Sequence, residues 1–110
     1  MLEVRVVVYI DTTGRSAFTR WFEELNPEAA AKVTTALYRM GQGNFSNVEG
    51  VGGGVFEYRI DFGPGYRIYF GKDGETLVVL LGGSSKKRQQ QAIQAAQQSW
   101  KEYKRRKAHG

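Results

Sequence analysis

The clearest pattern in the chain is an alternation of apolar and polar residues through VFEYRIDFGPGYRIYF, from Val55 to Phe70. A period of two residues is typical of a β-strand that buries one face. Gly63-Pro64-Gly65 interrupts the pattern at its centre, where a hairpin loop is expected. The segment therefore predicts two antiparallel strands.

A loop of three residues also predicts the pairing across this hairpin. It places Asp61 opposite Arg67, and Arg59 opposite Tyr69. Because successive side chains point to opposite faces, any odd loop length separates an apolar face from an ionisable one. The apolar face holds Phe56, Tyr58, Ile60, Phe62, Tyr66, Ile68 and Phe70, and the ionisable face holds Glu57, Arg59, Asp61, Arg67 and Tyr69.

Two further strands are predicted outside the hairpin. Residues 2–10, LEVRVVVYI, are rich in β-branched residues and are followed by turn-forming residues. A turn at 72–75 leads to TLVVLL, which is apolar on both faces as a central strand should be, and Gly82-Gly83 is expected to end it. The glycine-rich segment 41–54 lacks a phosphate-loop lysine and is interpreted as a mobile loop near a binding surface.

Helical spacing of apolar residues predicts three helices. Ser16 is expected to cap the first, and Asn26 to cap the second with Pro27 at its first position. A third, basic helix is expected from about residue 85 to 107, docked through Trp100 and Tyr103. The predicted buried positions are Phe18, Trp21, Phe22 and Leu25 in the first helix, Ala30, Val33, Leu37 and Met40 in the second, and Ile93, Ala96, Trp100 and Tyr103 in the third.

The predicted order of elements is β-α-α-β-β-β-α. It favours an α+β fold, with a four-stranded sheet of antiparallel type and a helical hairpin on the apolar face. At 110 residues, the whole chain 1–110 is expected to form a single domain.

Composition narrows the classes of function. The chain has no cysteine, which excludes disulfides and thiolate chemistry. No apolar run reaches the roughly 20 residues that a membrane helix needs, and the N-terminus does not resemble a signal peptide, so a cytoplasmic protein without a membrane partner is expected. With one histidine and no carboxylate cluster, neither a metal nor a cofactor is expected.

The positive charge is concentrated near the C-terminus. The net charge is +5, yet eight of the sixteen Lys and Arg, against one of the eleven acids, follow residue 84. Such a surface attracts polyanions. A basic tail that only increases solubility is the alternative.

Five motifs in order resemble one known family. They are F-x-x-W-F-x-x-L at 18–25, GNF at 43–45, the hairpin sequence at 55–70, LLGGSSKK at 80–87 and W-x-x-Y at 100–103. Together they resemble the RelE/ParE superfamily of toxins from type II toxin–antitoxin modules, within the HigB-like branch called addiction module killer proteins. The resemblance extends over nearly the whole chain.

This resemblance implies a toxin that cleaves messenger RNA on the ribosome, inhibits translation and is neutralised by a cognate antitoxin, commonly a helix-turn-helix protein. Its RNA-contacting positions correspond here to Arg59, Arg67, and Lys86 with Lys87 or Arg88. Two departures concern the chemistry. Asp61 occupies a position that is basic in well-known ribonucleases of the family, and 89–91 lack a tyrosine that some members have.

Cleavage by a ribose 2′-hydroxyl requires a proton acceptor, charge stabilisation at phosphorus and a proton donor for the leaving oxygen. His109 is the only histidine and is next to the last residue, which favours a frayed end over catalysis. Charge stabilisation is better supplied, by two arginines and the lysines. The candidate catalytic residues are Arg67, Arg59, Asp61, Tyr69 and Lys87, and the candidate RNA-binding residues are Lys86, Lys87, Arg88, Arg59 and Arg67.

Three alternatives stay open. Asp61 and Arg67 can form a cross-strand ion pair that only holds the hairpin in register. A toxin of the same fold can inhibit DNA gyrase through its C-terminal helix without cleaving RNA. A third possibility is a nucleic-acid-binding module without toxicity.

Overall fold

The structure is a computed structural model that describes residues 3–110. Its elements follow in the order β1 (Arg5–Val8), α1 (Ala17–Glu23), α2 (Pro27–Gly41), β2 (Val48–Gly52), β3 (Val55–Ile60), β4 (Tyr66–Asp73), β5 (Leu77–Ser85), a 3-10 turn η1 (Lys86–Arg88) and α3 (Gln89–His109). The α+β class predicted from the sequence is confirmed.

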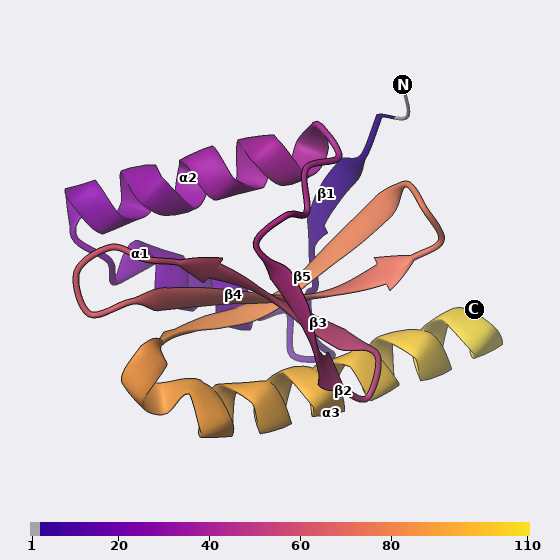
Figure 1. Ribbon diagram of the computed structural model, residues 1–110. Helices are drawn as coiled ribbons and strands as arrows, with labels where there is room; N and C mark the ends of the chain where they lie inside the picture. The colour runs from indigo at the N-terminus through magenta and orange to yellow at the C-terminus, as the bar shows by residue number, and fades with distance from the viewer. Residues whose placement is uncertain (1–2) are drawn as a thin grey trace.

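The strands form one mixed sheet in the order β1-β5-β4-β3-β2. The pairs β2–β3, β3–β4 and β4–β5 are antiparallel, whereas β1 runs parallel to β5. The prediction of an antiparallel sheet was therefore wrong for β1. The strand predicted to be apolar on both faces, β5, lies inside the sheet as expected. Helices cover both faces, with α1 and α2 on one side and α3 on the other (Figure 1).

The prediction of four strands was wrong, because the sheet has five. The additional strand, β2, lies within the glycine-rich segment that was interpreted as a mobile loop. Glycine weakens a strand and hides its pattern, but Val48 and Val51 remain half-buried against the sheet. The β1 strand is also shorter than predicted, and Leu2, where the prediction began, lies outside the described residues. The prediction that Gly82-Gly83 ends its strand was also wrong, because β5 continues through these glycines as far as Ser85.

The hairpin between β3 and β4 has the predicted faces but not the predicted pairing. Its loop spans 61–65, with a turn closed by the hydrogen bond from the Gly65 N–H to the Phe62 carbonyl at 2.9 Å. Arg59 is therefore opposite Arg67, and Asp61 lies in the loop rather than opposite Arg67. Because both loop lengths are odd, the separation into two faces survives the shift.

The face under the helical hairpin forms the larger core. Ile68, Phe70, Val33 and Met40 are completely buried there. All seven residues of the predicted apolar face belong to this core or pack against it, which confirms the face assignment.

Both N-caps of the helical hairpin are confirmed. The Ser16 hydroxyl accepts from the Thr19 N–H at 3.1 Å, and the Asn26 side chain accepts from the Ala29 N–H at 2.9 Å. The buried stripe of α2 differs slightly from the prediction, with Ala29, Val33, Ala36 and Met40 buried. Two alanines in the stripe allow α2 to approach the sheet closely, and the predicted Ala30 and Leu37 are only half-buried.

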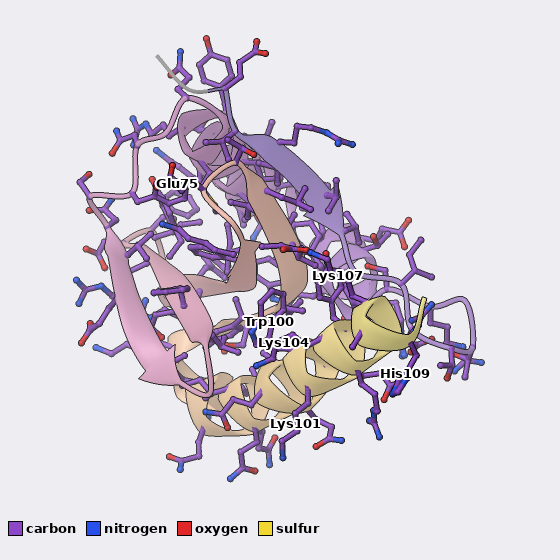
Figure 2. All side chains as sticks on the ribbon, turned by 90° about the vertical axis from the view of Figure 1, so that its right-hand side faces the viewer. Glu75, Trp100, Lys101, Lys104, Lys107 and His109 are labelled. Carbon is purple, nitrogen blue, oxygen red and sulfur yellow. The ribbon has the colours of Figure 1, made fainter. Side chains whose placement is uncertain are left out.

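The helix α3 packs on the opposite face through Ala96 and Trp100, with Ile93 and Tyr103 beside them, as predicted. The Trp100 indole lies directly over Gly71 of β4, where a Cβ would overlap the ring. Figure 2 shows Trp100 between the helix and the sheet, whereas Lys101 and His109 extend from its outer side.

A polar cluster fixes the C-terminal half of α3 to the end of β4. The Asp73 carboxylate accepts from the Tyr103 hydroxyl and from the Lys107 ammonium, both at 2.6 Å. The Lys107 and Tyr103 donors lower the pKa of Asp73. The hydrogen bond to Asp73, together with partial burial, raises the pKa of Tyr103 to about 12.

We expect Gly71→Ala to lower the free energy of unfolding by about 1–3 kcal/mol, because the new methyl group would displace Trp100. The matched control is Gly82→Ala in β5, where a Cβ meets no atom within 4 Å. Urea denaturation of both variants measures the difference. Equal stabilities would contradict the close packing of Trp100 on β4.

The Tyr103 cluster predicts a loss of stability at alkaline pH. Its folded-state pKa of about 12 exceeds the ordinary value of 10.0, so the folded protein holds this proton more strongly than the unfolded chain. The stability that the Tyr103 hydroxyl contributes is therefore complete below pH 10 and is lost as the pH rises toward 12. Denaturation at a series of alkaline pH values should show a steeper decline for the wild type than for Tyr103→Phe, and parallel declines would contradict this assignment.

Candidate nucleic-acid interface

The candidate residues gather at the end of the sheet where the β3–β4 loop meets the start of α3. The backbone N–H of Lys86 donates to the Gly65 carbonyl at 2.9 Å, which joins η1 to the hairpin loop. Gly65 lies between two of the cations, since a Cβ there would be 3.4 Å from Lys86 Cβ and 3.8 Å from an Arg67 terminal nitrogen. Segments 61–67 and 85–88 thus form one surface region.

Arg59 and Arg67 are directly opposite each other on β3 and β4. Residues opposite in an antiparallel pair project from the same face of a sheet, so the prediction that both guanidinium groups lie on one side is confirmed. Their surroundings differ. The Arg59 side chain is 47% exposed, whereas that of Arg67 is 8% exposed.

Each arginine is paired with a glutamate that the sequence analysis did not select. Arg59 lies 3.5 Å from the exposed Glu49 carboxylate of β2, and Arg67 lies 3.7 Å from the buried Glu57 carboxylate of β3. Glu49 and Glu57 are themselves opposite each other across β2 and β3. Like charges are therefore directly opposite each other, and each ion pair forms diagonally between neighbouring strands, so that the two acids and two bases largely neutralise one another.

The first turn of α3 covers the Glu57–Arg67 pair. The Gln89 side-chain amide donates to the other Glu57 oxygen at 2.8 Å. An Arg67 terminal nitrogen donates to the Tyr66 carbonyl at 3.1 Å. The Arg67 Nε is buried without a hydrogen-bond partner among the described residues, because 3.7 Å to Glu57 is an ionic contact only. The guanidinium is therefore enclosed and incompletely satisfied.

Tyr69 is completely buried under α3, and its hydroxyl shares a 3.0 Å hydrogen bond with the Ser84 hydroxyl. Burial raises the pKa of Tyr69, and the Glu57 charge acts in the same direction, against the opposing effects of Ser84 and Arg67. A phenol in this position does not reach a substrate on the surface and holds its proton firmly. Its role in this structure is to pack the sheet against α3.

The exposed cations of the region are Arg59 and the three consecutive residues of η1, Lys86, Lys87 and Arg88. None of the η1 side chains forms an ion pair among residues 3–110. Asp61 is exposed in the hairpin loop. A cleft of about 450 Å³ begins beside Arg88, where Trp21 and Tyr66 form part of its wall.

The structure thus brings Arg59, Arg67 and η1 to one end of the sheet, as predicted. Arg59 and η1 are exposed there, whereas Arg67 is buried. Sequence reasoning missed Glu49, Glu57 and Gln89. Glu57 could have been found from the sequence, because the alternation along its strand places it on the same face as Arg59. The partner of Glu49 depends on β2, which the glycine-rich sequence concealed.

Other sites are not formed in the part of the chain that the structure describes. Within residues 3–110, no three His, Cys, Asp or Glu side chains come together in a group able to hold a metal ion. No helix of that range has the length and apolar character needed to cross a membrane. His109 is exposed at the end of α3, and the region around Arg59 lies at the opposite end of that helix.

Chemically, this arrangement suits the binding of phosphates. Guanidinium and ammonium groups pair with phosphate oxygens, and four of them are exposed beside a hairpin loop. Proton transfer is less well provided, with Glu49 and Asp61 as the exposed carboxylates of the region.

Comparison with known proteins identifies a relative whose description names no activity. No family model matches the chain. A Haemophilus influenzae protein described as uncharacterized is 39% identical over 77 residues, which are 69% of this chain and 76% of that protein. This chain belongs to the same family as the Haemophilus protein. The function of this chain therefore has to be inferred from the site itself.

We expect Glu57→Gln to lower the free energy of unfolding by about 3–5 kcal/mol, because it leaves the buried Arg67 charge without a counter-ion. Glu49→Gln is the matched control, since it removes the exposed partner of Arg59 and should change stability by at most about 1 kcal/mol. Chemical denaturation of the two variants distinguishes them. A stability of Glu57→Gln equal to that of Glu49→Gln would show that the buried pair does not stabilise the fold.

Proposed function

We propose that this protein is the toxin of a type II toxin–antitoxin module, with a RelE/ParE-like topology, and that it cleaves messenger RNA on the ribosome without a metal ion. The antitoxin is its expected partner, and translation its target. The observation that carries the proposal is the gathering of Arg59 and the η1 cations beside the β3–β4 loop. The order of sequence motifs described above supports it independently.

In this proposal, the exposed cations hold the RNA backbone. Arg59 and the η1 residues Lys86, Lys87 and Arg88 contact phosphates, which gives affinity that decreases with salt. Arg67 lies underneath, paired with Glu57, and reaches the RNA only if the first turn of α3 moves. These contacts do not read the RNA sequence, and the choice of cleavage site depends on the codon that the ribosome presents.

The reaction that fits is an internal transesterification. The ribose 2′-oxygen attacks the adjacent phosphorus, the bond to the 5′-oxygen of the next nucleotide breaks, and a 2′,3′-cyclic phosphate forms. The departing 5′-oxygen takes a proton from the exposed ammonium group of Lys87. Arg59 stabilises the charge that develops on the phosphate oxygens. Glu49, 3.5 Å from Arg59, is the exposed carboxylate best placed to accept the 2′ proton. The ribosome supplies most of the orientation.

A specific observation supports a second candidate function. Tyr69 and Arg67 are buried, and the exposed region holds no histidine. A toxin that binds its target without cutting RNA, as a gyrase inhibitor does, requires cations but no proton transfer. This candidate function predicts DNA damage with intact transcripts.

We expect Arg59→Gln to reduce RNA cleavage by roughly 100-fold, because one group that stabilises the transition state is lost. Expression in bacterial cells, followed by mapping of transcript ends, measures cleavage directly. Arg39→Gln is the matched control, because Arg39 is also exposed but lies on α2. Glu49→Gln should also reduce cleavage while leaving RNA binding intact.

Growth arrest with new transcript ends, relieved by Arg59→Gln and not by Arg39→Gln, supports the ribonuclease. Growth arrest with intact transcripts would reject RNA cleavage in favour of the second candidate. The absence of any growth effect would reject a toxin altogether.

A further inference from the structure

A short edge strand has unpaired backbone groups. The Arg5 and Tyr9 N–H groups donate to the carbonyls of Thr76 and Leu80, toward β5, so the alternate groups of Val6 and Val8 point away from the sheet. Within the described residues, no strand pairs with this side of β1. On the same side, the Val4 N–H donates to the Gly41 carbonyl at the end of α2, at 3.3 Å, so the open part of the edge begins at Val6. An apolar strand with an open edge is a template for an added strand.

Exposed apolar side chains and two hollows accompany this edge. Val8 and Ile10 are 37% and 55% exposed, and Tyr38 on α2 is the third large apolar side chain that is exposed among residues 3–110. A cleft of about 580 Å³ lies between β1 and the C-terminal half of α3, with Val7, Val79 and Tyr103 in its wall. If a further strand paired with β1, its side chains on the α3 side of the sheet would enter this cleft.

The second hollow, of about 490 Å³, lies on the other side of Ile10 and is bordered by Arg15 and Arg20. The first is bordered by Arg106 and Lys107. Ile10 contributes to both hollows, so one exposed apolar residue is flanked by cations from α3 on one side and from α1 and the segment preceding it on the other.

These cations are mostly available. Lys107 is paired with Asp73, but Arg15, Arg20 and Arg106 form no ion pair within residues 3–110. The guanidinium of Arg106 donates to the Ile10 carbonyl at 2.9 Å, next to the open edge. The nearby Asp11 carboxylate already accepts hydrogen bonds from the Thr13 and Arg15 backbone N–H groups. The groove is therefore apolar at its base and positive at its rim.

We propose that the β1 edge binds an extended segment of a partner protein in which apolar and acidic residues alternate. The backbone of the segment pairs with Val6 and Val8, one row of its side chains enters the cleft beside Val7, and carboxylates reach Arg15, Arg20 and Arg106. Single-stranded RNA fits less well, because the edge offers hydrogen-bonding backbone and aliphatic side chains rather than exposed aromatic rings. A second copy of this chain would bring like charges together.

This inference goes beyond the RNA-cleaving function and rests on it only where the partner is taken to be the antitoxin. The probe is a short peptide of alternating glutamate and valine, titrated into the full-length protein labelled for amide NMR. We expect the Val6 and Val8 amides to become protected from exchange. A peptide of alternating lysine and valine, with the same apolar content, should not bind.

Two variants locate the binding. Ile10→Glu should weaken the glutamate peptide by about tenfold or more, because it puts a negative charge where the segment lies. Tyr38→Glu is the matched control on α2 and should leave the affinity unchanged. Both positions are exposed, so folding is preserved and is checked by circular dichroism.

Equal binding of both peptides, no protection at Val6 and Val8, or self-association through β1 in sedimentation would each overturn the inference. Preferential binding of an RNA oligonucleotide at this edge would also overturn it. None of these measurements uses toxicity. Peptide binding without RNA cleavage would therefore reject only the proposed function, and cleavage without peptide binding would reject only this inference.

Discussion

The ion pair between Glu57 and Arg67 lies where β3, β4 and the first turn of α3 meet, and it connects the fold to the candidate site. Both groups are buried, Gln89 completes the coordination of the carboxylate, and the backbone of η1 is joined to the hairpin loop through Gly65. A buried charge needs its counter-ion, and the first residue of α3, Gln89, adds a hydrogen bond to this pair. The three cations of η1, which precede α3, are exposed at the same end of the sheet as Arg59.

In this arrangement, one arginine belongs to the interior of the fold and the other is available on the surface. Arg67 lies in the interior with Glu57, whereas Arg59 keeps an exposed partner, Glu49, that a phosphate can displace at little cost. The two arginines therefore differ, although they are opposite each other in the sheet. In the proposed function, an anionic polymer would meet Arg59 and η1 first, and only a movement of α3 would bring it to Arg67.

Much of the fold was predictable from the sequence, because it depends on residue patterns that stay the same when a loop length or a strand boundary is slightly wrong. The two faces of the hairpin depend only on the parity of its loop, so they were correct although the pairing moved Arg59 from Tyr69 to Arg67. The helix caps at Ser16 and Asn26 are local interactions and were also found. In contrast, β2 has a glycine-rich sequence whose pairing is decided by its neighbour, and the exposure of Arg67 depends on how α3 lies over the sheet. Neither property is encoded within one segment.

The central claim is that RNA contacts the end of the sheet around Arg59 and η1. It is tested most directly by titrating the labelled protein with a short RNA whose 2′-hydroxyls are methylated, so that it binds without being cut. The account predicts amide shift changes in the hairpin loop, at Arg59 and across Lys86–Arg88, which weaken as salt is added. Shift changes confined to α2 or to the C-terminal half of α3, or none at all, would contradict it.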